Sequence, residues 1–204
     1  MKILLIVVTI LFQTSLQVKE DILKISIYYE SLCPDSIRFI TKQLYPSYAK
    51  IDSSVELDFV PYGKATQHIV NGQWVFKCQH HKRECQGNKY QVCGLSQNVS
   101  QQQKIDFVNC VMESFNPVNE STIVNCACKF ELSSDDILEC GRSQQGDELL
   151  AKNGDQTHAV KPKITFIPTI VFNNIYDDYI HKSAFNSFLS TVYRILRHQR
   201  TANN

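Results

Sequence analysis

The cysteines constrain the fold of this 204-residue chain more than any other feature. Of the eight, Cys33 stands alone, and the other seven lie within residues 78–140, where little apolar periodicity predicts a packed core. In an oxidising compartment we expect disulfides to hold this stretch together. Seven is an odd number, so one more thiol is free, bonded to another chain, or bonded to Cys33. Cys126 and Cys128 are too close in sequence for an unstrained mutual bridge, so one of them is the candidate odd thiol.

The N-terminus has the pattern of a secretory signal peptide. Lys2 precedes an apolar run over 3–12, and a short polar exit ends at residue 17. No stretch reaches the roughly eighteen apolar residues of a membrane helix. We therefore expect a signal peptide over 1–17 and a secreted protein without a membrane span.

The balance of charged residues and the glycosylation sequons limit the binding partners and the compartment that we expect. The chain has 21 basic and 20 acidic residues, a balance that provides no field for nucleic acid or an acidic membrane. Asn98 and Asn119 begin Asn-x-Ser sequons in polar segments. In a secreted chain each predicts a glycan on a solvent-facing loop.

The first part of the chain has the pattern of a strand, a helix and a second strand. Apolar and polar residues alternate over 22–29 and again over 55–62, and apolar residues recur at helical spacing over 36–48, with an interruption near Pro46. Because a helix connects the two strands, we expect them to be parallel.

The middle of the chain, from about 64 to 159, shows no matching alternation of strands and helices, although helices are indicated over 101–115 and 135–140. The sheet resumes with a strand over 169–172, a turn at Asn173-Asn174, a possible edge strand over 175–179 and a closing helix over 183–197. The pattern predicts an α/β fold: a thioredoxin-like sheet with a helical, disulfide-rich insertion, in one domain over 18–204.

Cys33 lies between the first strand and its helix, where a thioredoxin-like fold has the first cysteine of Cys-x-x-Cys. A helix N-terminus favours the reactive thiolate. The second cysteine of such a motif resolves the mixed disulfide, and here Ser36 takes its place. Cys33 is therefore a vestigial or monothiol nucleophile, unless it is simply paired or buried.

Pro168 precedes the late strand, where a thioredoxin-like fold carries a cis-proline opposite its redox cysteine. A cis peptide there would turn the preceding backbone toward an extended substrate strand. An ordinary trans strand start is the alternative.

The segment over 78–93 mixes cysteines and histidines. Zinc could use Cys78, His81, Cys85 and Cys93, but these spacings form no paired Cys-x-x-Cys knuckles, and oxidation competes for the thiols. We expect disulfides there, with no metal and no cofactor.

The same segment resembles the signature of the gamma-interferon-inducible lysosomal thiol reductases (GILT), Cys-Gln-His-Gly-x-x-Glu-Cys-x-x-Asn-x-x-x-x-Cys. His81 replaces the glycine, and the resemblance continues through 28–33, 60–63 and Pro168. The residues that match in register are Cys78, Gln79, His80, Glu84, Cys85, Asn88 and Cys93.

This resemblance implies a thioredoxin-like fold with a helical insertion, a glycosylated secretory or lysosomal protein, and reduction of protein disulfides at acidic pH. The family's active dithiol corresponds to Cys33 and Ser36, so the chain departs from the family at the resolving residue. Cys128 is additional to the family's usual set, which makes it the possible odd thiol. The remaining disulfide candidates are Cys78, Cys85, Cys93, Cys110, Cys126 and Cys140.

Two functional hypotheses follow. In the first, a secreted GILT-like protein has lost dithiol reductase activity and binds a protein partner, near Cys33 and Pro168 or through the insertion. In the second, Cys33 remains a catalyst of disulfide exchange on protein substrates, with an external thiol or another cysteine as resolver. The sequence leaves the partner and the oligomeric state open.

Overall fold

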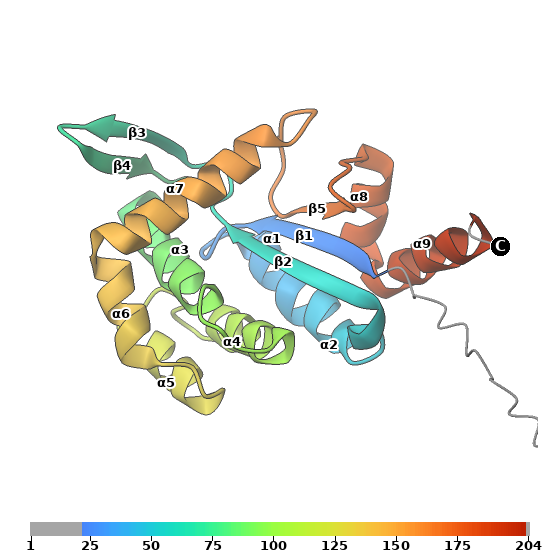
Figure 1. The fold of residues 1–204 in the computed structure, drawn as a ribbon, viewed down its shortest axis with the longest axis horizontal. Helices are drawn as coiled ribbons and strands as arrows, with labels where there is room; N and C mark the ends of the chain where they lie inside the picture. The colour runs from blue at the N-terminus through green and yellow to red at the C-terminus, as the bar shows by residue number, and fades with distance from the viewer. Residues whose placement is uncertain (1–21, 203–204) are drawn as a thin grey trace, which may run out of the picture.

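A computed structural model describes residues 22–202 of the chain. The signal peptide predicted over 1–17 lies outside the described residues. Within the described part, three strands form a central sheet in the order β2-β1-β5, and two more form a separate hairpin, β3–β4 (Figure 1).

The central sheet combines strands from both ends of the chain. β1 (Leu23–Tyr29) and β2 (Val55–Pro61) pair in parallel, as the sequence predicts. β5 (Thr169–Phe172) pairs with β1 in antiparallel orientation. β1 is therefore central, and its carboxyl end leads directly into Cys33.

The connection from β1 to β2 is one continuous helical segment. It consists of α1 (Pro34–Phe39), a π-helical stretch (Ile40–Leu44) and α2 (Tyr45–Tyr48), followed by a 3-10 turn (Asp52–Ser54). The interruption predicted near Pro46 takes the form of the π-helical stretch that precedes the proline. Pro46 has no N–H to donate, and the wider π-helical turn before it accommodates the missing hydrogen bond. The chain therefore stays helical through the proline.

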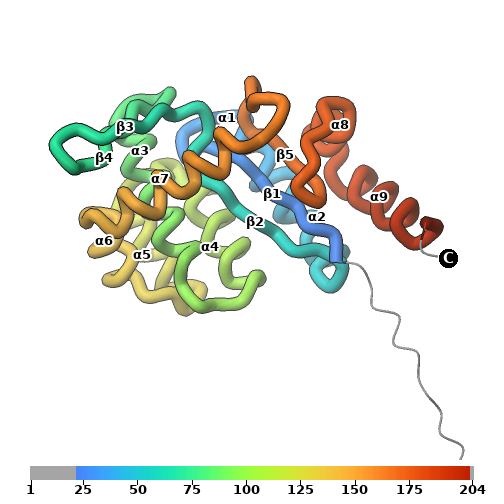
Figure 2. The backbone as a smooth tube through the Cα atoms, turned by 45° about the horizontal axis from the view of Figure 1, so that its top comes forward, coloured from blue at the N-terminus to red at the C-terminus, as the bar shows by residue number. Residues whose placement is uncertain are grey.

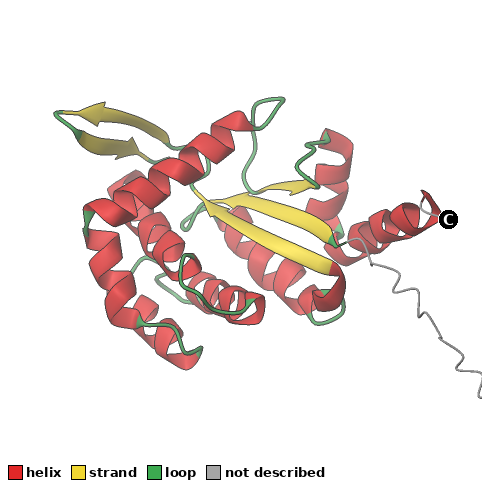
Figure 3. Ribbon diagram, in the orientation of Figure 1, coloured by secondary structure: helices red, strands yellow, loops and turns green. Residues whose placement is uncertain are grey.

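The segment between β2 and β5 is mostly helical, but it begins with a hairpin that the sequence pattern does not predict. β3 (Thr66–Val70) and β4 (Gln73–Lys77) meet at a turn in which Asn71 and Gly72 have positive φ angles. Most of the hairpin's residues are exposed, and it projects from one end of the molecule (Figure 3). The helices that follow are α3 (His81–Leu95), α4 (Gln101–Glu113), α5 (Glu120–Lys129), α6 (Ser134–Arg142) and α7 (Gln144–Ala159).

The C-terminal part differs from its prediction in two ways. The expected edge strand over 175–179 is a single bridge at Ile175, after which Asp177 caps α8 (Asp178–Asn186). The expected single helix over 183–197 is two helices, because the chain leaves helical geometry at Ser187 before α9 (Phe188–Ala202) begins. In Figure 2, α8 and α9 lie toward the β5 edge of the sheet, and α3–α7 lie toward the β2 edge.

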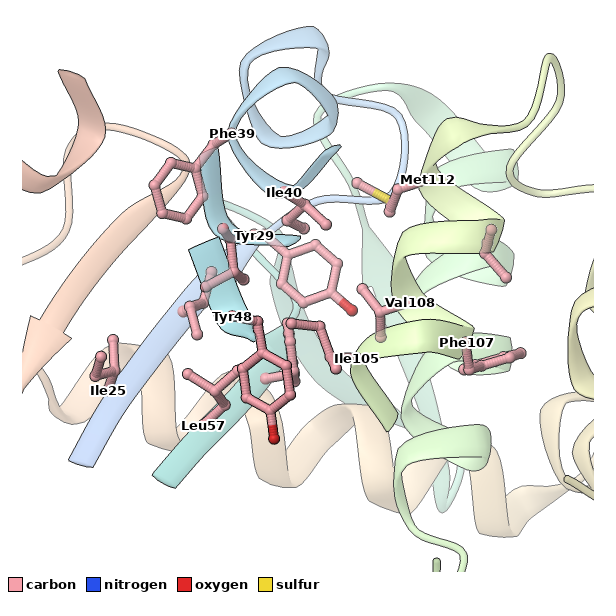
Figure 4. Packing of buried hydrophobic residues seen from close by; sticks show 14 of the residues in the cluster. Ile25, Tyr29, Phe39, Ile40, Tyr48, Leu57, Ile105, Phe107, Val108 and Met112 are labelled. Carbon is pink, nitrogen blue, oxygen red and sulfur yellow. The ribbon is translucent and has the colours of Figure 1, made fainter. Parts of the chain in front are cut away.

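The sheet is buried on both faces because its strands alternate apolar side chains between two layers. Ile25, Ile27 and Tyr29 of β1 belong to the main core, which includes residues of α1 and α4. Figure 4 shows the Tyr29 ring between Ile40 and Val108. Tyr28, on the opposite face, belongs to a smaller cluster that contains Cys33.

His181 of α8 supports the edge strand β5. It is buried beside the rings of Phe166, Tyr176 and Phe185, and its Nδ1 accepts a hydrogen bond from the Ile170 N–H at 3.3 Å. An acceptor nitrogen is unprotonated, and burial lowers the pKa of His181 below 6.5, with Asp178 opposing this shift and Lys182 reinforcing it.

We expect His181 to make stability fall with acidification. Unfolded histidine binds a proton near pH 6.5 while the folded side chain remains neutral, so the free energy of unfolding decreases as pH drops through this range. His181→Asn keeps a side-chain acceptor and removes the titration. Urea denaturation at pH 7.5 and 5 should show a smaller loss for His181→Asn than for wild type or for the exposed control His198→Asn. Equal losses in all three proteins would show that His181 is not responsible.

Candidate functional site

Cys33 lies at the junction that the sequence predicts, as the N-cap residue of α1. Its N–H donates to the Glu30 carbonyl at 3.3 Å, which closes a turn over residues 30–33, called here the Cys33 turn. Its Sγ lies 3.7 Å from the Ile167 carbonyl oxygen, and the Ile167–Pro168 peptide is cis. The structure therefore brings Cys33 and the Pro168 loop together across 134 positions of sequence.

The thiol of Cys33 is free and largely covered, with 9% of the residue exposed. Its neighbours form an apolar cluster that includes Val60, Ile164 and Ile167. The adjacent Asp35 carboxylate pairs with Arg38 at 2.9 Å, so its charge has a local partner.

Ser36 lies in the first turn of α1 and is completely buried. Its hydroxyl oxygen accepts a hydrogen bond from the Glu30 N–H at 3.3 Å. The side chain that stands in place of a second cysteine therefore holds the Cys33 turn together. A hydroxyl in this role supplies geometry and no redox chemistry.

Helix α3 clamps the same turn through the residues that match the GILT signature. The Ser31 N–H donates to Asn88 Oδ1 at 2.9 Å, and the Ser31 hydroxyl donates to the Glu84 carbonyl at 3.2 Å. Gly87 allows this approach, because a Cβ there would lie 2.6 Å from the Ser31 hydroxyl oxygen. These contacts explain the spacing of Glu84 and Asn88. The two residues are one helical turn apart, so both face Ser31.

Glu30, His80 and Glu84 form a polar cluster beside the hydrogen bonds that join Ser31 to α3. His80 Nδ1 lies 2.5 Å from Glu84 Oε2 and 3.5 Å from Glu30 Oε2. Burial raises the pKa of Glu30 to about 7; Glu84 also raises it, while the Lys64 N–H, the Lys64 charge and His80 oppose the shift. The Glu30 carboxyl is therefore largely protonated in a weakly acidic compartment.

Three disulfides brace the helical insertion. Cys78–Cys85 joins the end of the hairpin to the first turns of α3, Cys93–Cys140 joins α3 to α6, and Cys110–Cys126 joins α4 to α5. The alternative zinc set loses all its thiols to these bonds, since Cys78, Cys85 and Cys93 are all paired. The clamp helix α3 is thus fixed at both ends.

Cys128 is the other free thiol, and it is exposed. It lies on α5 with its Sγ 3.8 Å from the Ser134 hydroxyl. Figures 1 and 2 both place α5 away from α1, at the far end of the helical insertion. The structure does not bring Cys128 and Cys33 into one site.

The two sequons lie on the surface. Asn98 is exposed in the loop between α3 and α4, and Asn119 is exposed as the N-cap of α5, where its Oδ1 accepts from the Ser121 N–H at 3.0 Å. Glycosylation at either site stays a prediction.

Comparison with known proteins identifies the family. The sequence model described as "Gamma interferon inducible lysosomal thiol reductase (GILT)" matches residues 24–130. The chain belongs to the GILT family. It is 34% identical to the "Gamma-interferon-inducible lysosomal thiol reductase-like protein" of Anopheles gambiae, over 79% of this chain and 72% of that protein. It is 36% identical to "GILT-like protein 1" of Drosophila melanogaster, over 82% of this chain and 72% of that protein.

Solved structures confirm the predicted fold. DsbA of Chlamydia trachomatis superposes with a TM-score of 0.65 at 13% identity, covering 90% of this chain and 89% of that one. Oxidised BdbD of Bacillus subtilis gives a TM-score of 0.59 at 14% identity, with 86% of each chain covered. This GILT-family chain therefore has a thioredoxin-like fold with a helical, disulfide-bonded insertion. Across residues 22–202, the helices are too short or too polar to cross a bilayer.

The sequence patterns assign no role to Glu30 or Ser31, although both are fully buried polar residues at the site. The sequence does contain a signal for Glu30 and Ser31. They directly follow a buried strand and precede the candidate reactive cysteine, so they form the turn that leads to Cys33. Their partners, Glu84 and Asn88, match the signature, but linear spacing does not show which segment α3 contacts.

We expect Asn88→Ala to loosen the Cys33 turn. The substitution leaves the buried Ser31 N–H without an acceptor, which should lower the free energy of unfolding by about 1–3 kcal/mol. Cys33 should then react several-fold faster with iodoacetamide. Mass spectrometry measures the extent of alkylation of each thiol over time. The exposed Cys128 of the same molecule is the internal reference, and Asn186→Ala on the surface of α8 is the matched control. An unchanged rate of Cys33 alkylation in Asn88→Ala would show that the Asn88 hydrogen bond does not restrain the Cys33 turn.

Proposed function

We propose that this chain is a secretory-pathway member of the GILT family that has lost dithiol reductase turnover and acts by binding a protein partner. One observation carries the proposal: a buried serine, hydrogen-bonded to the Cys33 turn, occupies the position of the resolving cysteine. The relatives named as thiol reductases supply the reference chemistry.

The reaction fails at its second step. In the first, the Cys33 thiolate attacks one sulfur of a substrate disulfide; a Cys33–substrate disulfide forms, and the other substrate sulfur leaves as a thiolate. In the second, a neighbouring thiolate attacks the Cys33 sulfur, releases the remaining substrate sulfur and forms an enzyme disulfide. Ser36 has no sulfur to form that disulfide, so the mixed disulfide persists.

No other cysteine of the chain is placed as a substitute. Six of the eight are in disulfides, and the remaining free thiol, Cys128, lies on α5, away from α1. Release of a trapped substrate therefore depends on a thiol from outside the chain.

The surface beside Cys33 supports a binding role. A groove of about 370 Å³ runs between residues 63–66 and the segment after α7, with Ile164 and Thr165 on its wall. Ile164 also belongs to the apolar cluster that contains Cys33, so one residue links the groove to that cluster. An extended polypeptide could lie in this groove with a side chain against the thiol.

The second candidate is a monothiol exchange enzyme. The observation that favours it is the free Cys33 thiol at a helix start, beside the Pro168 loop. With an abundant small thiol as the resolving nucleophile, the mixed disulfide would be released and the small thiol oxidised.

The proposed setting is the secretory pathway, with secretion as the principal destination and the lysosome as the alternative. The predicted signal peptide, the three disulfides and the two exposed sequons support it, because disulfides persist in oxidising compartments.

Turnover assays on a protein disulfide at pH 4.5 and pH 7, with cysteine or glutathione supplied, separate the two candidates. We expect wild type to form a stoichiometric Cys33 adduct before the small thiol is added and, once it is added, to turn over at least tenfold more slowly than Ser36→Cys. Cys128→Ser should behave as wild type. If wild type matches Ser36→Cys and Cys33→Ala is inactive, the chain is an enzyme and the binding proposal is wrong.

A further inference from the structure

Three potential metal ligands converge where the first residue of the Cys33 turn meets the start of α3. Glu30 follows β1, His80 is the N-cap of α3, and Glu84 lies in the first turn of α3. One ligand atom from each lies within 4.8 Å of the other two. We propose that Glu30, His80 and Glu84 form a binding site for a divalent transition-metal ion of the zinc class. The site is separate from the Cys33 chemistry and independent of the function proposed above.

The donor set and the spacing suit such an ion. One imidazole nitrogen and two carboxylate oxygens are ligands that zinc accepts, with a solvent molecule completing four-coordination. Two ligands bound at about 2.1 Å in a tetrahedral arrangement lie about 3.4 Å apart. His80 Nδ1 and Glu30 Oε2 are already 3.5 Å apart. The 2.5 Å separation from Glu84 Oε2 must open by about 1 Å, and the half-exposed His80 ring can move to do so.

Backbone groups hold each carboxylate with one oxygen turned toward His80. The Lys64 N–H donates to Glu30 Oε1 at 2.8 Å, and the His80 N–H donates to Glu84 Oε1 at 3.0 Å. Oε2 of each glutamate is the atom that faces Nδ1. Hydrogen bonds to the distal atoms of ligating groups orient them and tune the metal, so this is the arrangement of a built site.

The fold makes room for the site. A Cβ at Gly63 would lie 2.1 Å from the Glu30 side chain, so only glycine allows the chain to pass there, and its φ of +66° also favours glycine. The Glu30 and Glu84 side chains are fully buried, whereas the His80 side chain is 37% exposed. An ion could therefore enter past His80 and bind between two fixed carboxylates.

When both carboxyl groups are ionised, the charge of the cluster favours a cation. Two buried glutamate side chains face one imidazole, and the further charged group acting on Glu30 is Lys64. Buried carboxylates are stable when they are paired, protonated or bound to a metal. A divalent ion would neutralise the pair and fasten the Cys33 turn to α3 more firmly than hydrogen bonds alone.

The test is zinc binding by the full secreted chain, purified without a histidine tag and freed of metal with a chelator. The parent protein carries Cys33→Ala and Cys128→Ser, which removes both free thiols as competing ligands. Competition with a chromophoric chelator at pH 7.5 should give one Zn²⁺ per chain. Co²⁺ should give the visible absorption of a protein-bound ion, and Zn²⁺ should raise the melting temperature.

In the same background, His80→Gln and Glu30→Gln should bind Zn²⁺ at least tenfold more weakly. His81→Gln, at the exposed neighbouring histidine, should bind as the parent does. If Glu30→Gln does not fold, the half-exposed His80 still decides the outcome. Binding that is absent in the parent, or equal in the parent and His80→Gln, would overturn the proposal and leave a hydrogen-bonded cluster only.

Discussion

The attachment of the Cys33 turn to helix α3 is the constraint on which the rest of the site depends. Ser31 of the turn is held from two sides, by the Asn88 side chain and by the Glu84 carbonyl. Because these groups are fully buried, water cannot replace a lost partner, and the geometry of the turn follows the position of α3. Disulfides near the two ends of α3 tie this helix to the end of the hairpin and to α6.

This arrangement explains why the insertion belongs to the site although it carries none of the thiol chemistry. β1 and α1 flank Cys33 in the chain and position it from one side. Here α3 adds a second support on the other side of the turn, and with it the Glu30–His80–Glu84 cluster. The residues that match the GILT signature are therefore mainly residues of attachment: three are in disulfides, and Glu84 and Asn88 hydrogen-bond to Ser31 of the turn.

The sequence predicted the elements whose pattern is local and strong. Alternation identified β1 and β2, and helical spacing identified α4 and the helix after Cys33. The β3–β4 hairpin escaped because most of its side chains are exposed, so no alternation of burial marks it. The edge strand expected over 175–179 gave way to α8, where the Asp177 carboxylate caps the Ile180 N–H. The cluster around Glu30 was beyond prediction, because Glu30 lies about fifty residues from His80 and Glu84 in the sequence.

Ser36 shows how chemistry and architecture separate at this site. The serine hydroxyl is buried and holds the Glu30 N–H, so replacing sulfur by oxygen leaves the turn supported. Cys33 remains free, the Pro168 loop remains opposite it, and the groove beside Ile164 remains open. Under the proposed function these features hold a polypeptide, and the sulfur that would release it from a disulfide is the missing atom. The contacts that position the Cys33 thiol do not depend on a sulfur at position 36, since the Ser36 hydroxyl oxygen itself accepts the hydrogen bond from the Glu30 N–H.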